Sequence, residues 1–331
     1  MNFDKYILIT GGAGFIGSHL IRRFVAEYKN YFIINIDNLT YASNLKSISD
    51  LDNEPNYQFI KGDISNKTVI KNIFDSFKID SIIHLAAESH VDNSIENPFL
   101  FVQTNILGTI NLLEEAKLRW SNSESNHLFY GISTDEVYGS LGEKGYFSED
   151  SPYLPKSPYS ASKASADHFI RAFGNTYNIP FIISNCSNNY GPNQHVEKLI
   201  PLTIKNIVND KKIPIYGDGQ AIRDWIFVLD HVDAIDIIFH QGIVGETYNV
   251  GANKEVKNLE LVKSICALID QKTGSKNSEN LIQLVSDRPG HDKRYAINSS
   301  KIMSQLDWFP KTKFEKGLNL TIDWYLDKLA K

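Results

Sequence analysis

The sequence predicts an α/β fold built on a doubly wound parallel sheet, with a smaller C-terminal α/β lobe. Through the first half of the chain, short apolar runs alternate with segments of helical periodicity, which is typical of a parallel sheet covered by helices on both faces. After Asn188 this alternation stops. A chain of 331 residues is also too long for one compact core, so we expect a second lobe.

The expected elements follow from these runs. Apolar runs predict strands at 6–10, 31–37, 57–63, 81–87, 127–134 and 180–186, and helical periodicity predicts helices at 15–28, 68–77, 98–120 and 158–177. Beyond Asn188 we expect a helix at 198–208 and two extended segments at 212–219 and 223–228. We therefore assign 1–187 plus about 226–250 to the sheet domain, and about 188–225 plus 251–331 to the second lobe.

Composition excludes several classes of function. The 39 acidic and 34 basic residues give a net charge of −5, so no broad basic field is expected to bind nucleic acid. The two cysteines, Cys186 and Cys266, do not have metal-ligand spacing and suit a reduced, cytoplasmic protein. No apolar run has the length of a membrane span, and the N-terminus lacks the pattern of a secretory signal. We expect no metal and no membrane partner.

A glycine-rich turn follows the first expected strand and opens the first expected helix. Gly11, Gly14 and Gly17 leave room for backbone N–H groups to approach a pyrophosphate, which the positive end of the helix dipole favours. Asp37 ends the next strand, 20 residues after Gly17, where a carboxylate can accept hydrogen bonds from a ribose and repel a 2′-phosphate. The alternative is a glycine turn that serves packing alone. The strand–turn–helix context favours a Rossmann-type domain that binds NAD in preference to NADP.

Tyr159 and Lys163 stand four residues apart near the start of an expected helix and so share one face. A phenol is a poor base near neutral pH, but a neighbouring ammonium group favours its phenolate form. Tyr159 can then accept the proton of an alcohol while hydride leaves the same carbon. The alternative is that Tyr159 and Lys163 are a surface pair with no catalytic role. The glycine turn earlier in the chain argues against this alternative.

The fifth expected strand ends in Thr134, Asp135 and Glu136. Two adjacent carboxylates in a partly dry site do not both ionise easily, which supplies an acid and a base at one pH. The alternative is a solvated loop, as for most adjacent Asp–Glu pairs. The apolar approach through residues 128–132 favours the chemical interpretation.

Together these residues resemble the extended short-chain dehydrogenase/reductase family over essentially the whole chain. The segment STDEVYG (133–139) resembles the nucleotide-sugar 4,6-dehydratases within that family. Further segments resemble the dehydratases that act on dTDP-glucose, namely LTYASNL (39–45), AAESHVDNSI (86–95), NCSNNYGP (185–192), EKLIP (197–201), RDWIFVLDH (223–231) and DRPGHDKRYAIN (287–298).

The resemblance implies a role for each catalytic residue. Thr134 and Tyr159 would hold the sugar O4, with Tyr159 as the base for oxidation at C4 and Lys163 supporting it. Glu136 would remove the C5 proton, and Asp135 would protonate the departing C6 hydroxyl. Hydride would then return to C6, leaving NAD unchanged, in a pathway to dTDP-rhamnose or a related deoxysugar.

The resemblance also implies contact residues. The predicted cofactor contacts are Gly11, Gly14, Phe15, Ile16, Gly17, Asp37, Asn38, Leu39, Thr40, Asp63, Ile64, Leu85, Ala86, Ala87, Ser89, Thr104, Tyr159, Lys163 and Asn188. The predicted substrate contacts are Ser89, Thr134, Asp135, Glu136, Asn189, Glu197, Lys198, Leu199, Pro214, Tyr216, Arg223, Asn258, Arg288, His291 and Tyr295. Among them, Arg223 and Arg288 suit a diphosphate because guanidinium binds phosphate oxygens bidentately.

The sequence departs from the family pattern in four places. Ser43 replaces a common glycine, Asn93 stands where arginine is usual, residues 193–196 lack the usual Tyr-x-Phe-Pro stretch, and the segment between Gly139 and Tyr153 is short. None removes a predicted catalytic group.

The alternatives are a UDP-sugar 4,6-dehydratase or a 4-epimerase, and more remotely a non-catalytic NAD-sensing protein. The family implies a homodimer, in which the helices at 98–120 and 158–177 would pair with their copies.

Overall fold

The computed structural model describes residues 3–120 and 126–329. The chain folds into two compact units. Unit 1 comprises Met1–Val137, Ser157–Asn185 and Ala234–Tyr248, and unit 2 comprises Tyr138–Lys156, Cys186–Asp233 and Asn249–Lys331. Among the described residues, no helix combines the length and the apolar character that crossing a membrane requires.

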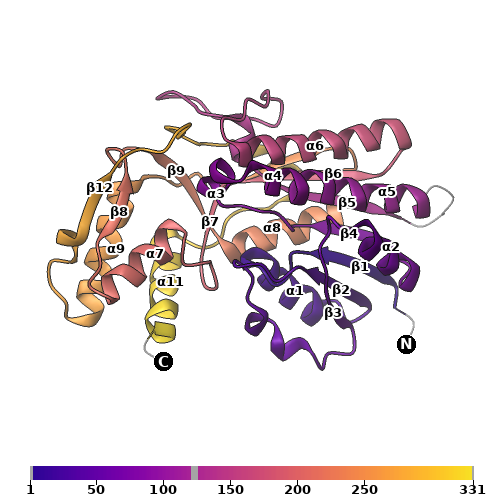
Figure 1. Cartoon of the computed structure of the whole chain (residues 1–331), viewed down its shortest axis with the longest axis horizontal. Coiled ribbons are helices and arrows are strands. Elements are labelled where there is room, and N and C mark those ends of the chain that lie inside the picture. Colours follow the sequence, from indigo (N-terminus) through magenta and orange to yellow (C-terminus); the bar gives the residue numbers. More distant parts are fainter. Residues whose placement is uncertain (1–2, 121–125, 330–331) are drawn as a thin grey trace. The chain divides into compact units, whose positions relative to one another are not determined.

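A seven-stranded sheet forms the centre of unit 1, in the order β10-β6-β5-β4-β1-β2-β3 (Figure 1). β1 pairs with β2 and β4, β2 pairs with β3, and β4 pairs with β5, and all of these pairs are parallel. The strands are β1 (Lys5–Thr10), β2 (Tyr31–Asp37), β3 (Tyr57–Lys61), β4 (Ser81–His84), β5 (Leu128–Thr134), β6 (Phe181–Cys186) and β10 (Thr247–Val250). The order reverses between β1 and β4, and ligands of such sheets bind beyond the carboxyl ends of the strands at this point.

Helices cover both faces of this sheet (Figure 1). One core cluster joins the strands to α2, α5 and α6 through the almost fully buried side chains of Leu8, Ile82, Ile70, Leu112 and Ile170. On the other face α1 and α8 meet through the rings of Phe24 and Phe239, whose centroids are 5.6 Å apart. The helices that belong to unit 1 or enter it are α1 (Phe15–Glu27), α2 (Lys67–Ser76), α3 (Val91–Glu96), α4 (Pro98–Phe101), α5 (Gly108–Trp120), α6 (Pro158–Tyr177) and α8 (Val228–Gln241). Short 3-10 turns occur at Leu45–Ser47, Ser49–Leu51 and Asp135–Tyr138.

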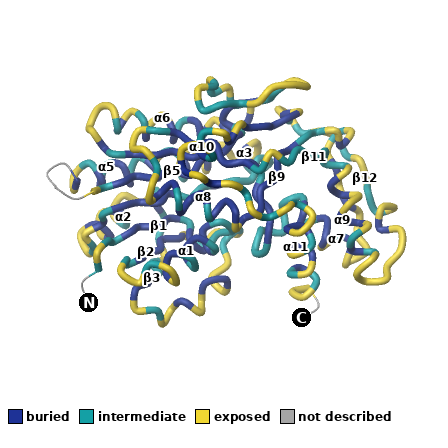
Figure 2. The backbone as a smooth tube through the Cα atoms, turned by 180° about the vertical axis from the view of Figure 1, so that it is seen from behind, coloured by how far each residue is buried: buried dark blue, intermediate teal, exposed yellow. Residues whose placement is uncertain are grey.

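Figure 2 shows that the buried residues follow the central strands. Every residue of β4 and β5 is buried, because both strands lie inside the sheet and are covered on both faces. β4 ends at His84, whereas the sequence predicts a strand through Ala87. Residues 85–87 therefore form a loop at the carboxyl end of the sheet.

The helix predicted at 98–120 contains an irregularity. Regular helix is present at Pro98–Phe101 and Gly108–Trp120, and a π-helical turn, Val102–Leu107, lies between them. Such insertions are frequent at functional sites. The buried residue of this turn is Asn105, which is 1% exposed.

Unit 2 has two small sheets and its own core. The sheets have the orders β11-β9-β7 and β12-β8. Their strands are β7 (Asn188–Tyr190), β8 (Ile213–Tyr216), β9 (Ile222–Phe227), β11 (Glu255–Lys257) and β12 (Ile282–Val285). The helices are α7 (Leu199–Val208), α9 (Asn258–Thr273), α10 (Ser300–Leu306) and α11 (Phe314–Leu329), with a 3-10 turn at Ser278–Leu281. Apolar residues of α7, α9, α11, β8 and β9 form the core.

The observed unit boundaries differ from the predicted domain boundaries. Residues 138–156, predicted in the first domain, belong to unit 2, as do 226–233. The reason is backbone pairing that the local pattern does not show. Phe147 N donates to the carbonyl of Ala296 at 2.9 Å, and Leu141 N donates to the carbonyl of Arg294 at 3.0 Å.

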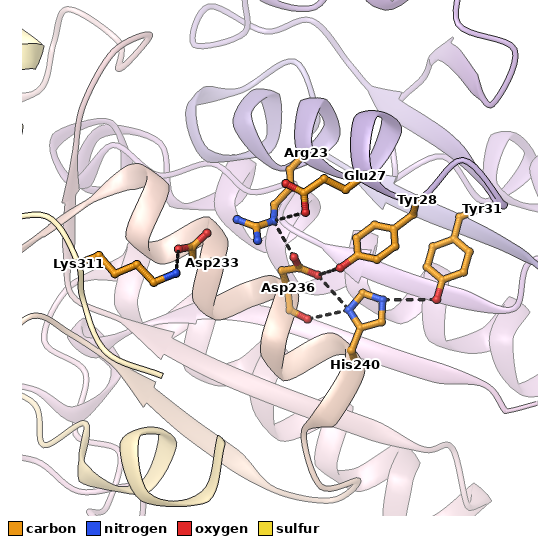
Figure 3. Close-up of polar contacts among 8 residues, drawn as sticks. All are labelled: Arg23, Glu27, Tyr28, Tyr31, Asp233, Asp236, His240 and Lys311. Atoms are coloured by element: carbon orange, nitrogen blue, oxygen red, sulfur yellow. Dashed lines mark hydrogen bonds and ion pairs between the residues drawn. The ribbon is translucent and has the colours of Figure 1, made fainter. Parts of the chain in front are cut away.

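One group of polar contacts ties α8 to α1 and β2, while Asp233 of the same helix pairs with Lys311 (Figure 3). The Asp236 carboxylate accepts hydrogen bonds from Arg23 Nε at 2.6 Å and Tyr28 Oη at 2.7 Å, and its Oδ1 lies 2.9 Å from His240 Nδ1. Tyr31 Oη lies 3.4 Å from His240 Nε2. Burial favours the neutral carboxyl, but these hydrogen bonds and the Arg23 charge outweigh it and lower the pKa of Asp236.

Candidate active site

The glycine turn is built for close backbone approach. Gly11 has φ +75°, and a Cβ on Gly17 would lie 2.2 Å from the carbonyl oxygen of Gly11. Gly14 N donates to that oxygen at 3.1 Å, and α1 starts at Phe15 without a side-chain cap. The first turn of α1 therefore follows a turn of three glycines and Ala13, and its N–H groups suit the pyrophosphate of a dinucleotide.

Asp37, at the end of β2, links this turn to the next loop. Its Oδ2 accepts a hydrogen bond from Ala13 N at 3.0 Å, and its Oδ1 accepts from Leu39 N and Ser43 Oγ, both at 2.8 Å. Ser43, one of the departures from the family pattern, thus supports the predicted ribose-binding carboxylate. Leu39 has φ +57°, as a tight turn after the strand requires.

The remaining predicted cofactor residues of unit 1 follow strand ends or line the neighbouring helices. Asn38 Nδ2 donates to Asp63 Oδ2 at 3.1 Å, and Ile64 is buried against Gly108. Leu85, Ala86, Ala87 and Ser89 lie in the loop after β4, Thr40 lies after β2, Phe15 and Ile16 open α1, and Thr104 lies in the π-helical turn. Asn188, also predicted to contact the cofactor, begins β7 of unit 2.

β5 delivers the two predicted catalytic carboxylates. It ends at Thr134, and a 3-10 turn begins at Asp135. Thr134 Oγ1 donates toward Asp135 Oδ1 at 3.4 Å and accepts from Glu136 N at 3.3 Å. Asp135 is only 2% exposed, whereas Glu136 is half-buried. The two adjacent acids therefore have different surroundings, as an acid–base pair requires.

The start of α6 carries the predicted Tyr–Lys pair. Ser157 caps this helix by accepting from Ser160 N, and Ser160 Oγ accepts from Ser157 N in return. Lys163 is buried and its Nζ donates to the carbonyl oxygen of Ile132 at 2.8 Å. That carbonyl lies two residues before Thr134. The contact therefore joins the helix that carries Tyr159 to the strand that carries the acids.

Sequence reasoning missed a second connection between β5 and α6. Ser133 Oγ donates to Asp167 Oδ2 at 2.6 Å, and both residues are buried. Asp167 follows Lys163 by four residues and Tyr159 by eight, so all three share one face of α6. This spacing was the available signal for a buried acid beside the predicted catalytic pair.

In unit 2, the structure brings Arg223 and Tyr295 together. The Arg223 guanidinium carbon lies 4.3 Å from the centroid of the Tyr295 ring, and its Nη2 donates to the carbonyl oxygen of Asp292 at 2.9 Å. Tyr295 Oη donates to Asp292 Oδ2 at 2.5 Å. Arg223 is only 5% exposed, so its orientation is fixed by protein contacts.

A second group of predicted substrate residues surrounds His291. Its Nδ1 lies 2.6 Å from Asp287 Oδ1, and its ring meets that of Tyr216 at 6.3 Å. The Arg288 guanidinium lies over Tyr216 at 5.4 Å. Burial, followed by the charge of Arg288, lowers the pKa of His291 despite the hydrogen bond with Asp287. Arginine rather than histidine therefore supplies positive charge here.

The other predicted substrate residues lie on β7, α7 and β8 and beside α9. Glu197 and Lys198 precede α7, which starts at Leu199, while Pro214 is on β8 and Asn258 starts α9. Asn189 uses its amide internally. Its Nδ2 donates to Ser187 O at 3.0 Å, and its Oδ1 lies 2.9 Å from His231 Nδ1. His231 was not predicted, and it holds Asn189 from the start of α8.

A model of the GDP-mannose 4,6 dehydratase family matches residues 8–321 of the chain. The chain belongs to this family. It is 52% identical over 330 residues to a dTDP-glucose 4,6-dehydratase of Haemophilus influenzae, covering 97% of both chains. It is 49% identical over 333 residues to a dTDP-glucose 4,6-dehydratase of Neisseria gonorrhoeae, covering 98% of this chain and 96% of the relative.

Solved structures similar to this chain include a dehydratase and an epimerase. The dTDP-glucose 4,6-dehydratase of Bacillus anthracis in complex with NAD has a TM-score of 0.88 and 44% identity, with 98% of each chain covered. The UDP-glucose 4-epimerase of Thermotoga maritima has a TM-score of 0.86 but 26% identity, covering 98% of this chain and 99% of its own. The fold is therefore shared with epimerases, and the sequence is more similar to the dehydratases.

Proposed function

We propose that this protein is an NAD-dependent hydro-lyase that converts dTDP-glucose to dTDP-4-keto-6-deoxyglucose. The observation that carries the proposal is the buried end of β5, where Asp135 and Glu136 follow Thr134 and where Lys163 is anchored. Two relatives that are 49–52% identical to this chain over almost its full length are named dTDP-glucose 4,6-dehydratase.

The residues of unit 1 divide the chemistry between them. When bound, NAD supplies the acceptor for the C4 hydride and the donor of a hydride to C6. Thr134 orients the sugar O4, and Tyr159 accepts its proton while Lys163 favours the phenolate. The resulting ketone acidifies the C5 proton, which Glu136 removes. Asp135 protonates the C6 oxygen, which leaves as water, and Glu136 returns a proton to C5 as C6 gains its hydride.

We assign the nucleotide diphosphate to residues of unit 2. Arg223 and Arg288 provide guanidinium groups, and Tyr216, His291 and Tyr295 surround them. Arginine is suited to phosphate because its planar donors bind two oxygens at once. The domain roles follow, with NAD assigned to unit 1 and nucleotide recognition to unit 2.

Incubation of the protein with NAD and either dTDP-glucose or UDP-glucose tests the proposal. We expect a 4-keto-6-deoxy sugar, formed by loss of one water, from dTDP-glucose at a higher kcat/KM. Faster turnover of UDP-glucose would favour a UDP-sugar dehydratase. Inversion at C4 with C6 intact would instead indicate the epimerase reaction, which the Asp135–Glu136 pair disfavours. A protein that binds NAD and changes neither sugar would be a sensor.

We also propose that the protein acts as a homodimer in the cytoplasm. Apolar side chains are exposed along the helices predicted to pair, with Phe99 at 82%, Leu118 at 61% and Tyr177 at 46%. Cys186 and Cys266 are both buried and no disulfide joins them, which suits a reducing compartment. Light scattering should show a dimer that Phe99→Glu dissociates, whereas Leu154→Glu, at an exposed apolar residue of unit 2, should not.

A further inference from the structure

His84, on β4, is a buried histidine that the proposed mechanism does not use. Its Nδ1 lies 2.7 Å from Thr10 Oγ1, and its Nε2 lies 2.9 Å from Thr109 Oγ1. Thr109 donates its single hydroxyl hydrogen to the carbonyl oxygen of Asn105 at 2.6 Å. Thr109 can therefore only accept from His84, so the imidazole carries its hydrogen on Nε2 and accepts from Thr10 at Nδ1.

The same hydrogen bonds continue into the helix that carries Tyr159. Asn105 Nδ2 donates to Ser162 Oγ at 2.8 Å, and Ser162 Oγ donates to the carbonyl oxygen of Tyr159 at 2.7 Å. Asn105 also fixes the loop after β4, because its Oδ1 accepts from Glu88 N at 2.8 Å. The π-helical turn makes this possible by directing Asn105 inward.

At its other end the network reaches the proposed cofactor turn. Thr10 is the last residue of β1, and its Oγ1 accepts from Ala86 N at 3.0 Å. A Cβ on Gly11 would lie 2.7 Å from the same nitrogen, so the glycine turn and the loop after β4 are in contact. His84 thus has one nitrogen facing the cofactor side and the other facing the Tyr159 side.

The charge state of His84 is fixed by its surroundings. Burial, followed by the positive charge of Lys163, lowers the pKa of His84 to about 3. The imidazole therefore stays neutral throughout the pH range near neutrality. A neutral ring is required for the network, because only this form has one donor and one acceptor.

We propose that His84 is a positioning residue for C4 oxidation, setting the helix that carries Tyr159 through Thr109 and the cofactor turn through Thr10. The inference rests on the proposed function. It adds to that function a buried residue which acts through hydrogen bonds of assigned direction and does not touch the substrate.

Two substitutions separate the two sides of the ring. In His84→Asn the side-chain amide reaches only the position of Nδ1, so the bond to Thr109 is lost and that to Thr10 is retained. In His84→Gln the amide reaches the position of Nε2, so the reverse holds. One lost buried hydrogen bond corresponds to roughly a tenfold effect. We expect His84→Asn to slow the reduction of bound NAD by substrate about tenfold and to leave NAD affinity unchanged. We expect His84→Gln to weaken NAD binding about tenfold.

Partner variants complete the design. Thr109→Val should reproduce the effect of His84→Asn, the double variant should be no worse than either, and Thr109→Ser should restore the parent rate. Tyr57→Phe is the matched control, because it removes a buried hydrogen bond from Asn35 at 3.0 Å that is not part of the network. It should lower thermal stability and leave NAD reduction unchanged. If His84→Asn and Thr109→Val lower thermal stability but leave the rate of NAD reduction unchanged, His84 is merely structural and the proposal is wrong.

Nitrogen NMR of histidine-labelled protein gives a readout independent of activity. We expect His84, assigned by its loss in His84→Asn, to show the neutral Nε2–H tautomer unchanged between about pH 5 and 8. Titration in this range, or the Nδ1–H tautomer, would overturn the proposal. A parent protein that makes no keto sugar would overturn the proposed function instead, while the tautomer and NAD affinity would still be measurable.

Discussion

At the scale of single residues, the end of β5 shows how two neighbouring carboxyl groups acquire different roles. Asp135 is almost completely buried, whereas Glu136 is half-buried in the same turn. Burial penalises a charged carboxylate, so Asp135 has the surroundings of a proton donor and Glu136 those of a base. Asp135 and Glu136 carry the same type of acidic group, and their different exposure to water gives them different chemical roles.

Glu136→Gln should separate oxidation from elimination. The amide keeps the shape of the side chain but cannot accept the C5 proton, whereas oxidation at C4 depends on Tyr159. The variant should still reduce bound NAD, visible as NADH absorbance, while C5 exchange with solvent deuterium and product formation are slow. Asp135→Asn should retain C5 exchange and be slow in losing the C6 hydroxyl. Product formation at the parent rate by Glu136→Gln would contradict this assignment.

Tyr159→Phe should lose oxidation and keep substrate binding. The phenyl ring retains its edge contact with Phe101, whose centroid lies 6.3 Å away, so local packing is preserved. Removing the base should slow reduction of bound NAD roughly a hundredfold or more. Rapid mixing with substrate measures this step directly. A normal rate of NAD reduction would show that another group accepts the O4 proton.

Asp37 is expected to set the preference for NAD over NADP. Asp37→Ala should narrow the preference for NAD over NADP, because the carboxylate no longer opposes a 2′-phosphate. Since Asp37 also holds Ser43, Ser43→Ala is the control for loosening of the loop. It should weaken both cofactors similarly. Titration of cofactor-free protein with each nucleotide tests this, and tighter binding of NADP by the parent would contradict it.

At the scale of elements, the buried carboxylate of Asp236 holds α8 against α1, and the His240 ring meets Tyr31 of β2 (Figure 3). Asp236 is 5% exposed and accepts from Arg23 and Tyr28, while the contact of Tyr31 reaches only His240. Burial, followed by the hydrogen bond to Asp236, raises the pKa of Tyr28, so this phenol remains a donor. A hydrogen bond to a buried charged group stabilises the folded state more than an exposed hydrogen bond between neutral groups.

Tyr28→Phe and Tyr31→Phe form a matched pair that tests this difference. The first removes a donor from the Asp236 carboxylate and should lower the free energy of unfolding by about 2 kcal/mol. The second removes a long, exposed contact to His240 and should cost less than about 0.5 kcal/mol. Urea denaturation measures both. Equal losses of unfolding free energy in the two variants would show that the hydrogen bond from Tyr28 to Asp236 contributes no more than the contact of Tyr31 with His240.

At the scale of the whole molecule, both units bury a neutral histidine. Burial, and for His84 the charge of Lys163, lowers the pKa of His84 and of His231 from 6.5 to about 3. Between these values the unfolded chain binds one more proton at each histidine than the folded chain. The free energy of unfolding therefore falls as pH decreases from 6.5 toward 3, and the full contribution is present above pH 6.5.

The expected slope is about 1.4 kcal/mol per pH unit for each histidine. His231→Asn should remove one such contribution between about pH 6 and 5. Urea denaturation across this pH range provides the measurement. An identical slope in His231→Asn and the parent would mean that His231 is not buried in its neutral form.

The sequence by itself determined the α/β class, the glycine turn, the Tyr159–Lys163 pair and the acids after β5. Each of these depends on residues close in the chain, through periodicity, turn chemistry or helix spacing. Only the tertiary structure decided that residues 138–156 join unit 2, that Asn105 turns inward, and that His84 lies between two hydroxyl groups. These features join positions that are far apart in the sequence, such as Thr10 and His84, which are 74 residues apart. Local patterns carry no record of them, because packing and loop closure select the partners.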